Sequence, residues 1–213
     1  MYVTEKSFLA NVANHELTIL RDDGLYRHLQ FKQPNSGICR FEILTFPGHL
    51  VYVGDMGSYT SQRLEDMFEF FHVSPLAGRP QLHINTGYWG EKVRATDRNE
   101  GLATFSEEKF TRVIRELRRT WIRENAKRTT PAQRRELWDD IEETILKADP
   151  TRMLDKAMEF NSFVNDDVGS FYFQDLWDYN FNEPSGRFVW CCYAIAWGIQ
   201  RYDETKDAAL MAA

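Results

Sequence analysis

The amino-acid sequence predicts an α+β fold, in which an N-terminal antiparallel β-meander of four to five strands is followed by a helical half closed by a buried apolar C-terminal helix. Three observations predict this fold. Apolar and polar residues alternate from residue 15 to residue 60, with Gly, Pro and Asp between the alternating runs. Helical spacing replaces the alternation from residue 64. Close to the C-terminus, residues 188–199 are apolar on every side of a helix.

The apolar run at 188–199 contains Trp190, Tyr193 and Trp197. It is too short to span a bilayer, which needs about 20 apolar residues. A helix that is apolar all round is typical of the centre of a protein core. We therefore expect the rest of the chain to pack around this helix. Its adjacent Cys191 and Cys192 favour buried thiols over disulfides.

The alternating region predicts a meander of strands joined by short turns. The expected strands are residues 15–21, 25–32, 38–46 and 49–53, with a short fifth at 58–60. Asp23-Gly24 is a hairpin signal, because both positions of a two-residue turn favour positive φ. A helix at 64–71 is expected to pack across the sheet, so that residues 1–72 form the sheet and its packing helix.

Helix start signals mark the helical half. Ser106 is an N-cap candidate for a helix at 106–128, and Thr130-Pro131 begins a second helix that ends at Asp149-Pro150. A third helix is expected at 151–163 and an acidic, aromatic loop at 164–186. The expected organisation is ordered loops at 73–105 with at most a short helix near 91–95, a helical half at 106–205 sharing the core of the sheet, and a frayed tail at 206–213.

The composition predicts a folded protein with a sizeable core. Of the 213 residues, 43% are hydrophobic and 14% are aromatic. The net charge of −6 gives no general attraction to nucleic acid or to an anionic membrane. No apolar leader opens the chain, which predicts a cytoplasmic protein with no membrane partner.

The sequence carries none of the common catalytic motifs. It has no phosphate-binding glycine loop, nucleophile elbow, zinc-protease motif or paired C-x-x-C. We therefore expect no cofactor and no metal, and a non-enzymatic role is favoured. The alternative is an enzyme acting on nucleotides or nucleic acid, with a site on the rim of the sheet near His28, His49 and Asp55.

Acidic residues far outnumber basic ones from Glu136 to Glu183, and aromatic residues are interleaved with them. Aromatic residues of this kind are enriched at the centres of protein interfaces. A negative surface with exposed aromatics can dock onto a basic groove, including one that normally holds nucleic acid. The alternative is that the aromatics cover the core and the acids are merely solvated. The candidate partner-binding residues are Asp166, Asp167, Asp175, Trp177, Asp178 and Tyr179.

The predicted helix at 106–128 has a basic face. Arg112, Arg115 and Arg119 lie on one side of it, roughly opposite its apolar stripe. Such a face can contact nucleic-acid phosphates. Four glutamates on the same helix dilute its charge, so a simply solvated face is the other interpretation.

Five stretches are similar to stretches of known proteins: residues 15–29, 47–50, 54–57, 66–71 and 190–199. Together they resemble a family of bacteriophage and prophage proteins of unknown function. The resemblance implies an accessory protein made inside a bacterium that binds and modulates a host macromolecule, antagonists of antiviral defence such as CRISPR among them. The implied partner is a host protein or ribonucleoprotein complex. The family offers no established catalytic residue to transfer to this sequence.

Overall fold

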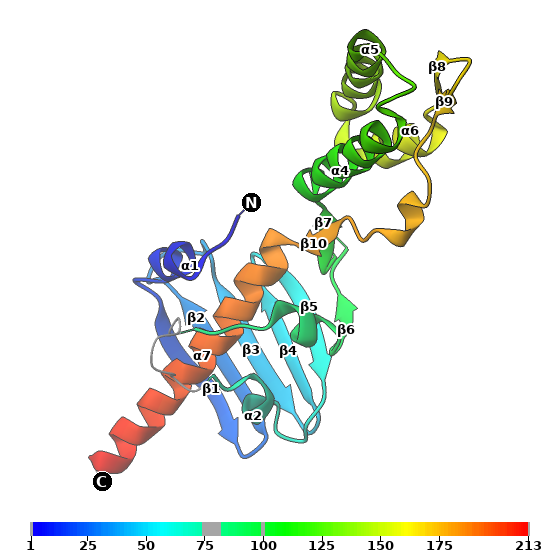
Figure 1. Cartoon of the computed structure of the whole chain (residues 1–213). Coiled ribbons are helices and arrows are strands. Elements are labelled where there is room, and N and C mark those ends of the chain that lie inside the picture. Colours follow the sequence, from blue (N-terminus) through cyan, green and yellow to red (C-terminus); the bar gives the residue numbers. More distant parts are fainter. Residues whose placement is uncertain (1, 74–81, 99–100, 213) are drawn as a thin grey trace. The chain divides into compact units, whose positions relative to one another are not determined.

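The computed structural model describes residues 2–73, 82–98 and 101–212, and it divides into two compact units (Figure 1). The first unit comprises Met1–Thr104 and Pro184–Ala213, and the second comprises Phe105–Glu183. The buried hydrophobic residues form two separate clusters, one within each unit. This corrects the expectation that residues 106–205 share the core of the sheet, because the apolar C-terminal helix packs with the sheet and the helices before it have a core of their own.

The first unit is built on a six-stranded antiparallel sheet in the order β1-β2-β3-β4-β5-β6, which confirms the predicted α+β class. Its strands are β1 (Glu16–Asp23), β2 (Tyr26–Lys32), β3 (Phe41–Phe46), β4 (His49–Gly54), β5 (Gly57–Gln62) and β6 (Val93–Thr96).

The sixth strand lies where loops and a short helix at 91–95 were expected. The short helix is α3 (Thr86–Gly90), capped by Asn85, and it ends before β6 begins. Four residues are too few to show alternation, and β6 is held as a strand by its pairing with β5. Residues 74–81 of the expected loop region, which include Ser74-Pro75 and Gly78-Arg79-Pro80, fall outside the described residues.

The first hairpin turn differs from the prediction by one residue. Asp23 pairs with Tyr26, so the turn is Gly24-Leu25 rather than Asp23-Gly24. Gly24 has a φ of 60°, whereas Asp23 remains in the strand. A glycine adopts positive φ without the steric cost that a side chain would impose.

One face of the sheet is covered by α7 (Gly186–Met211), which crosses it diagonally (Figure 1). Phe31, Phe41, Ile43 and Tyr52 are fully buried on this face. The helices α1 (Glu5–Asn11), α2 (Met67–Phe71) and α3 each contact α7. The helix runs on to Met211, so most of the expected frayed tail at 206–213 is an exposed final stretch of α7.

The second unit is mostly helical and has its own hydrophobic cluster. Its elements are α4 (Glu107–Asn125), α5 (Pro131–Ile141), the π-helix η1 (Glu142–Leu146), the 3₁₀-helix η2 (Pro150–Arg152), α6 (Met153–Glu159), β8 (Ser162–Asn165), β9 (Gly169–Phe171) and the 3₁₀-helix η3 (Leu176–Asp178). The predicted N-caps Ser106 and Thr130 are confirmed. The third predicted helix ends at Glu159 rather than at 163, because the chain becomes extended at Phe160 and enters the β8–β9 hairpin.

Two short strands mark the points where the chain enters and leaves the second unit. They are β7 (Ala103–Phe105) and β10 (Asn182–Pro184), and they pair in a two-stranded sheet.

Candidate functional site

The candidate partner-binding residues all lie in the second unit, within residues 166–179, which we call the acidic–aromatic segment. Asp166 and Asp167 occupy the turn of the β8–β9 hairpin. Asp175 precedes η3 in the left-handed conformation, with a φ of 54°. The other three candidates are in η3 or directly after it.

Burial separates the aromatic and apolar residues of this part of the chain into two sets. Phe171, Phe173, Leu176 and Phe181 are buried in the second hydrophobic cluster. Tyr172, Trp177 and Tyr179 have exposed fractions of 53%, 70% and 41%. The first set covers a core, as one of the two interpretations predicts, whereas the second set is exposed and its role in partner binding stays a prediction.

Trp177 differs from its two exposed neighbours in having no local contact. The Tyr172 hydroxyl accepts a hydrogen bond from Gln174 Nε2 at 3.2 Å, and the Tyr179 ring stacks on Phe181 at 6.0 Å. Trp177 makes no hydrogen bond and no ring contact with any residue that the structure describes. Single exposed apolar residues are common on protein surfaces, so Trp177 is notable only together with the exposed Tyr172 and Tyr179 nearby in the chain.

The carboxylates of the segment are also without cationic partners. None of Asp166, Asp167, Asp175 and Asp178 forms a salt bridge within the described part of the chain. Residues 136–183 hold thirteen acidic and three basic residues, which gives this stretch a net charge of −10. The acidic–aromatic segment therefore combines an exposed tryptophan with carboxylates that form no salt bridge among the described residues.

The sequence prediction left two exposed aromatic residues out of the candidate set. Phe163 has an exposed fraction of 67%, because it lies on strand β8 rather than on a helix. Tyr172 is one of the aromatic residues interleaved in the acidic stretch, but it is not among the six candidate residues. Its outward direction follows from the strand alternation between Phe171 and Phe173, which the sequence contains.

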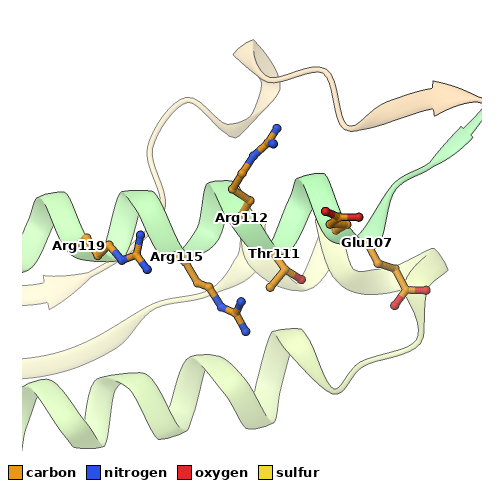
Figure 2. A pocket seen from close by; sticks show the side chains of 6 residues that line it. Glu107, Thr111, Arg112, Arg115 and Arg119 are labelled. Carbon is orange, nitrogen blue, oxygen red and sulfur yellow. The ribbon is translucent and has the colours of Figure 1, made fainter.

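The predicted basic face is present on α4. Arg112, Arg115 and Arg119 are exposed and line a shallow hollow of about 510 Å³ together with Glu107, Glu108 and Thr111 (Figure 2). Figure 2 shows the arginine side chains fanning out from successive turns of the helix. Among the described residues, no carboxylate lies within ion-pair distance of any of these three guanidinium groups.

Positive charge is concentrated on the adjoining side of α4 as well. The Arg118 guanidinium lies over the Trp138 ring of α5 at 4.5 Å, and its Nε has no hydrogen-bond partner. Partial burial lowers the pKa of Arg118, and the neighbouring charges of Arg119 and Arg135 lower it further. The Asp139 carboxylate acts on this pKa in the opposite direction, and it pairs with Arg135 at 2.9 Å.

The structure does not bring together the residues of the alternative sheet-rim site. His49 begins β4, whereas Asp55 follows its last residue, which separates them by about 20 Å at the rise of a β-strand. His28 lies on β2, where its Nε2 is bonded to the Glu42 carboxylate at 2.7 Å. His49 Nδ1 is within hydrogen-bond distance of the Pro47 carbonyl, at 3.0 Å. This grouping is therefore wrong as a single site.

Glu42 itself leads to a prediction for acid stability. A hydrogen bond with His28 lowers the pKa of Glu42 from its usual 4.5 to about 2, and bonds from Gln30 and Arg40 add to this effect. Because the folded-state pKa is depressed, the stabilisation is present above pH 4.5 and is lost as the pH falls towards 2. We expect Glu42→Gln to cost about 1–2 kcal/mol at pH 7 and to flatten the pH dependence in this window. Urea denaturation at several pH values measures both effects. The exposed Glu16→Gln is the control, and an equal flattening in it would contradict the assignment.

The described residues lack two further kinds of feature. They contain no cluster of three or more His, Cys, Asp or Glu side chains arranged to hold a metal ion. Within the same residues, no helix has the length and apolar character needed to cross a bilayer. Comparisons with protein-family models, with curated proteins and with solved structures find no match to this chain.

Proposed function

We propose that this chain is a non-enzymatic binding protein whose acidic–aromatic segment docks onto a basic surface of a host macromolecule and modulates it. The proposed setting is a bacterial cell in which a phage accessory protein binds a host protein or ribonucleoprotein complex. Antagonism of an antiviral defence system is one form that such modulation takes.

The exposure of Trp177 among unpaired carboxylates is the observation that supports this proposal. Tryptophan is the residue type most enriched at binding hot spots, where it fills a desolvated pocket of the partner. Asp175 and Asp178, which lie close to Trp177 in the chain, and the other carboxylates of the segment supply long-range attraction and orientation, which mainly raise the association rate. The two parts have separate roles, because the ring supplies affinity and the acids supply steering and specificity.

The test begins by capturing the partner and then measures it quantitatively. Tagged protein is incubated with nuclease-treated bacterial lysate, and a stoichiometric partner that survives high-salt washing is produced in pure form. We expect Trp177→Ala to weaken binding of this pure partner by at least tenfold in calorimetric titration, since a hot-spot truncation costs about 2 kcal/mol or more. The exposed position predicts no loss of folding stability.

The carboxylates are tested by charge-reversal pairs. We expect Asp166→Lys with Asp167→Lys to slow association several-fold, with the largest effect at low salt. The matched control is Glu136→Lys with Glu159→Lys, which makes the same charge change at exposed positions of the same unit outside the segment. Equal effects of the two pairs, or full affinity in Trp177→Ala, would reject the segment as the binding surface.

A further inference from the structure

The basic face of α4 is longer than the three arginines that the sequence singled out. Arg112, Arg115, Arg119 and Arg123 follow one another at i, i+3, i+7 and i+11, which keeps them on one side of an α-helix. All four are exposed. At 1.5 Å per residue, the row extends about 16 Å along the helix. We call these four residues the arginine row.

The arginine row has no internal counterion. No described carboxylate forms a salt bridge with any of the four, although the second unit contains seventeen acidic residues. Exposed arginines elsewhere in the chain do find partners, as Arg135 does with Asp139 at 2.9 Å and Arg201 does with Glu204 at 3.0 Å. The row is thus an uncompensated line of positive charge beside the shallow hollow of about 510 Å³.

Nearby cations strengthen the positive potential at the row. Arg118 lies against Trp138, and its pKa is lowered by burial and then by the neighbouring charges of Arg119 on the same helix and Arg135 on α5. Residues 105–135 hold ten basic and four acidic residues, which gives them a net charge of +6, in contrast to the −10 of residues 136–183. The second unit therefore has a basic first part and an acidic second part along its sequence.

Two features oppose anion binding at the arginine row: nearby glutamates and the net negative charge of the chain. Glu107 and Glu108 line the N-terminal end of the hollow, and Glu116 flanks the row. The chain as a whole also carries a net charge of −6. Salt at physiological strength screens charges beyond about 8 Å, so that the local set of arginines outweighs the net charge of the chain. Glu107 and Glu108 therefore weaken the positive potential most at Arg112, the N-terminal end of the row.

We propose that the arginine row binds the phosphodiester backbone of nucleic acid without reading its sequence. Guanidinium groups bond phosphate oxygens in a bidentate fashion. A row of about 16 Å matches about five nucleotide steps at 3.4 Å each. Evenly repeated backbone phosphates fit a line of cations at successive helical turns better than the irregularly spaced carboxylates of an acidic protein do. The site is separate from the acidic–aromatic segment and does not depend on the proposed function.

The test is fluorescence polarisation with a labelled 20-nucleotide single strand and a labelled 20-base-pair duplex, from 50 to 200 mM salt. Four phosphate contacts predict a slope of log affinity against log salt of about −3 for the single strand and about −3.5 for the duplex. We expect the triple variant Arg112→Gln, Arg115→Gln, Arg119→Gln to lose at least tenfold in affinity at 50 mM salt and to have a slope of about −1.

The matched control is a second triple variant, which removes three positive charges from the acidic part of the same unit. Its substitutions are Lys147→Gln, Arg152→Gln and Lys156→Gln. It is expected to keep both the affinity and the slope of the original protein. Replacement of the same three row arginines by lysine is expected to restore most of the affinity, since lysine binds phosphate as a point charge. This rescue distinguishes loss of a phosphate contact from loss of folding.

Three results would overturn the proposal. One is the absence of a polarisation change with either probe at 50 mM salt. Another is an equal loss in the glutamine triple variant and in the matched control. The third is competition by poly-glutamate as effective as that by unlabelled DNA of the same charge, which would show a general acidic partner instead of a phosphodiester backbone. None of these results bears on partner binding by Trp177.

Discussion

Replacing Trp190 by alanine is expected to lower the free energy of unfolding of the first unit by about 3–5 kcal/mol. The side chain is 1% exposed at the centre of α7. Its ring packs edge-on against Phe8 at 5.0 Å and Phe41 at 5.8 Å, and its Nε1 donates a hydrogen bond to Asn11 Oδ1 at 3.1 Å. The truncation removes contacts of α7 with both α1 and the sheet in one step.

Urea denaturation followed by circular dichroism measures the loss, and hydrogen exchange locates it. Because the two units have separate cores, faster exchange is expected in β2, β3 and α7 and not in α4 or α5. Trp177→Ala is the control, since truncation of an exposed tryptophan should change stability by no more than about 0.5 kcal/mol. A loss below 1.5 kcal/mol in Trp190→Ala, or equal losses in both variants, would contradict the central role of this residue.

The sheet shows where sequence patterns suffice to predict structure and where they fail. Strands β2 to β5 each contain six or seven residues with one face in the core, so their alternation is visible in the sequence. Strand β6 has only four residues and depends on its pairing with β5, a contact with no local signature. Pairing with a neighbouring strand of this kind determines whether a short segment becomes a strand, irrespective of the segment's own sequence.

The two separate cores could not be predicted because neighbours in sequence belong to different clusters. Phe181 is buried in the second cluster and Phe188 in the first, although only seven positions separate them. Both lie in aromatic stretches of similar composition. The division arises where the chain leaves the second unit through β10, and three exposed residues in a short strand give no periodic signal.

The two candidate surfaces also differ in how far they can be predicted from the sequence. The arginines of α4 were placed on one face because the geometry of a single helix is enough to do so. The outward direction of Trp177 was not predictable, since the segment around it is irregular and its neighbour Leu176 is buried. The 3₁₀ turn that follows Asp175 in its left-handed conformation has no repeating pattern of apolar residues from which its exposed side could be predicted.

Gly198 is a position in α7 at which a larger side chain is expected to be costly, because the helix lies close against the sheet there. A Cβ placed there would lie 2.7 Å from Ile43 Cδ1 and 3.1 Å from Phe31 Cζ, so α7 approaches the sheet as closely as a glycine allows. We expect Gly198→Leu to destabilise the first unit by about 3 kcal/mol through overpacking. In Gly198→Ala the clash is partly offset by about 1 kcal/mol of improved helix propensity.

A double-mutant cycle identifies the contact as the cause. Ile43→Val deletes the Cδ1 atom that lies nearest to the added Cβ. Alone, this change costs about 1 kcal/mol for the lost methyl group. In the Gly198→Ala background it should cost nothing or stabilise the fold, because the space it opens receives the new methyl group. A coupling of at least 1 kcal/mol is therefore expected between the two sites, well above the roughly 0.5 kcal/mol within which independent changes add. Simple additivity in urea denaturation would mean that the helix shifts to accommodate the methyl group, and that the glycine is not required for the close approach of α7 to the sheet.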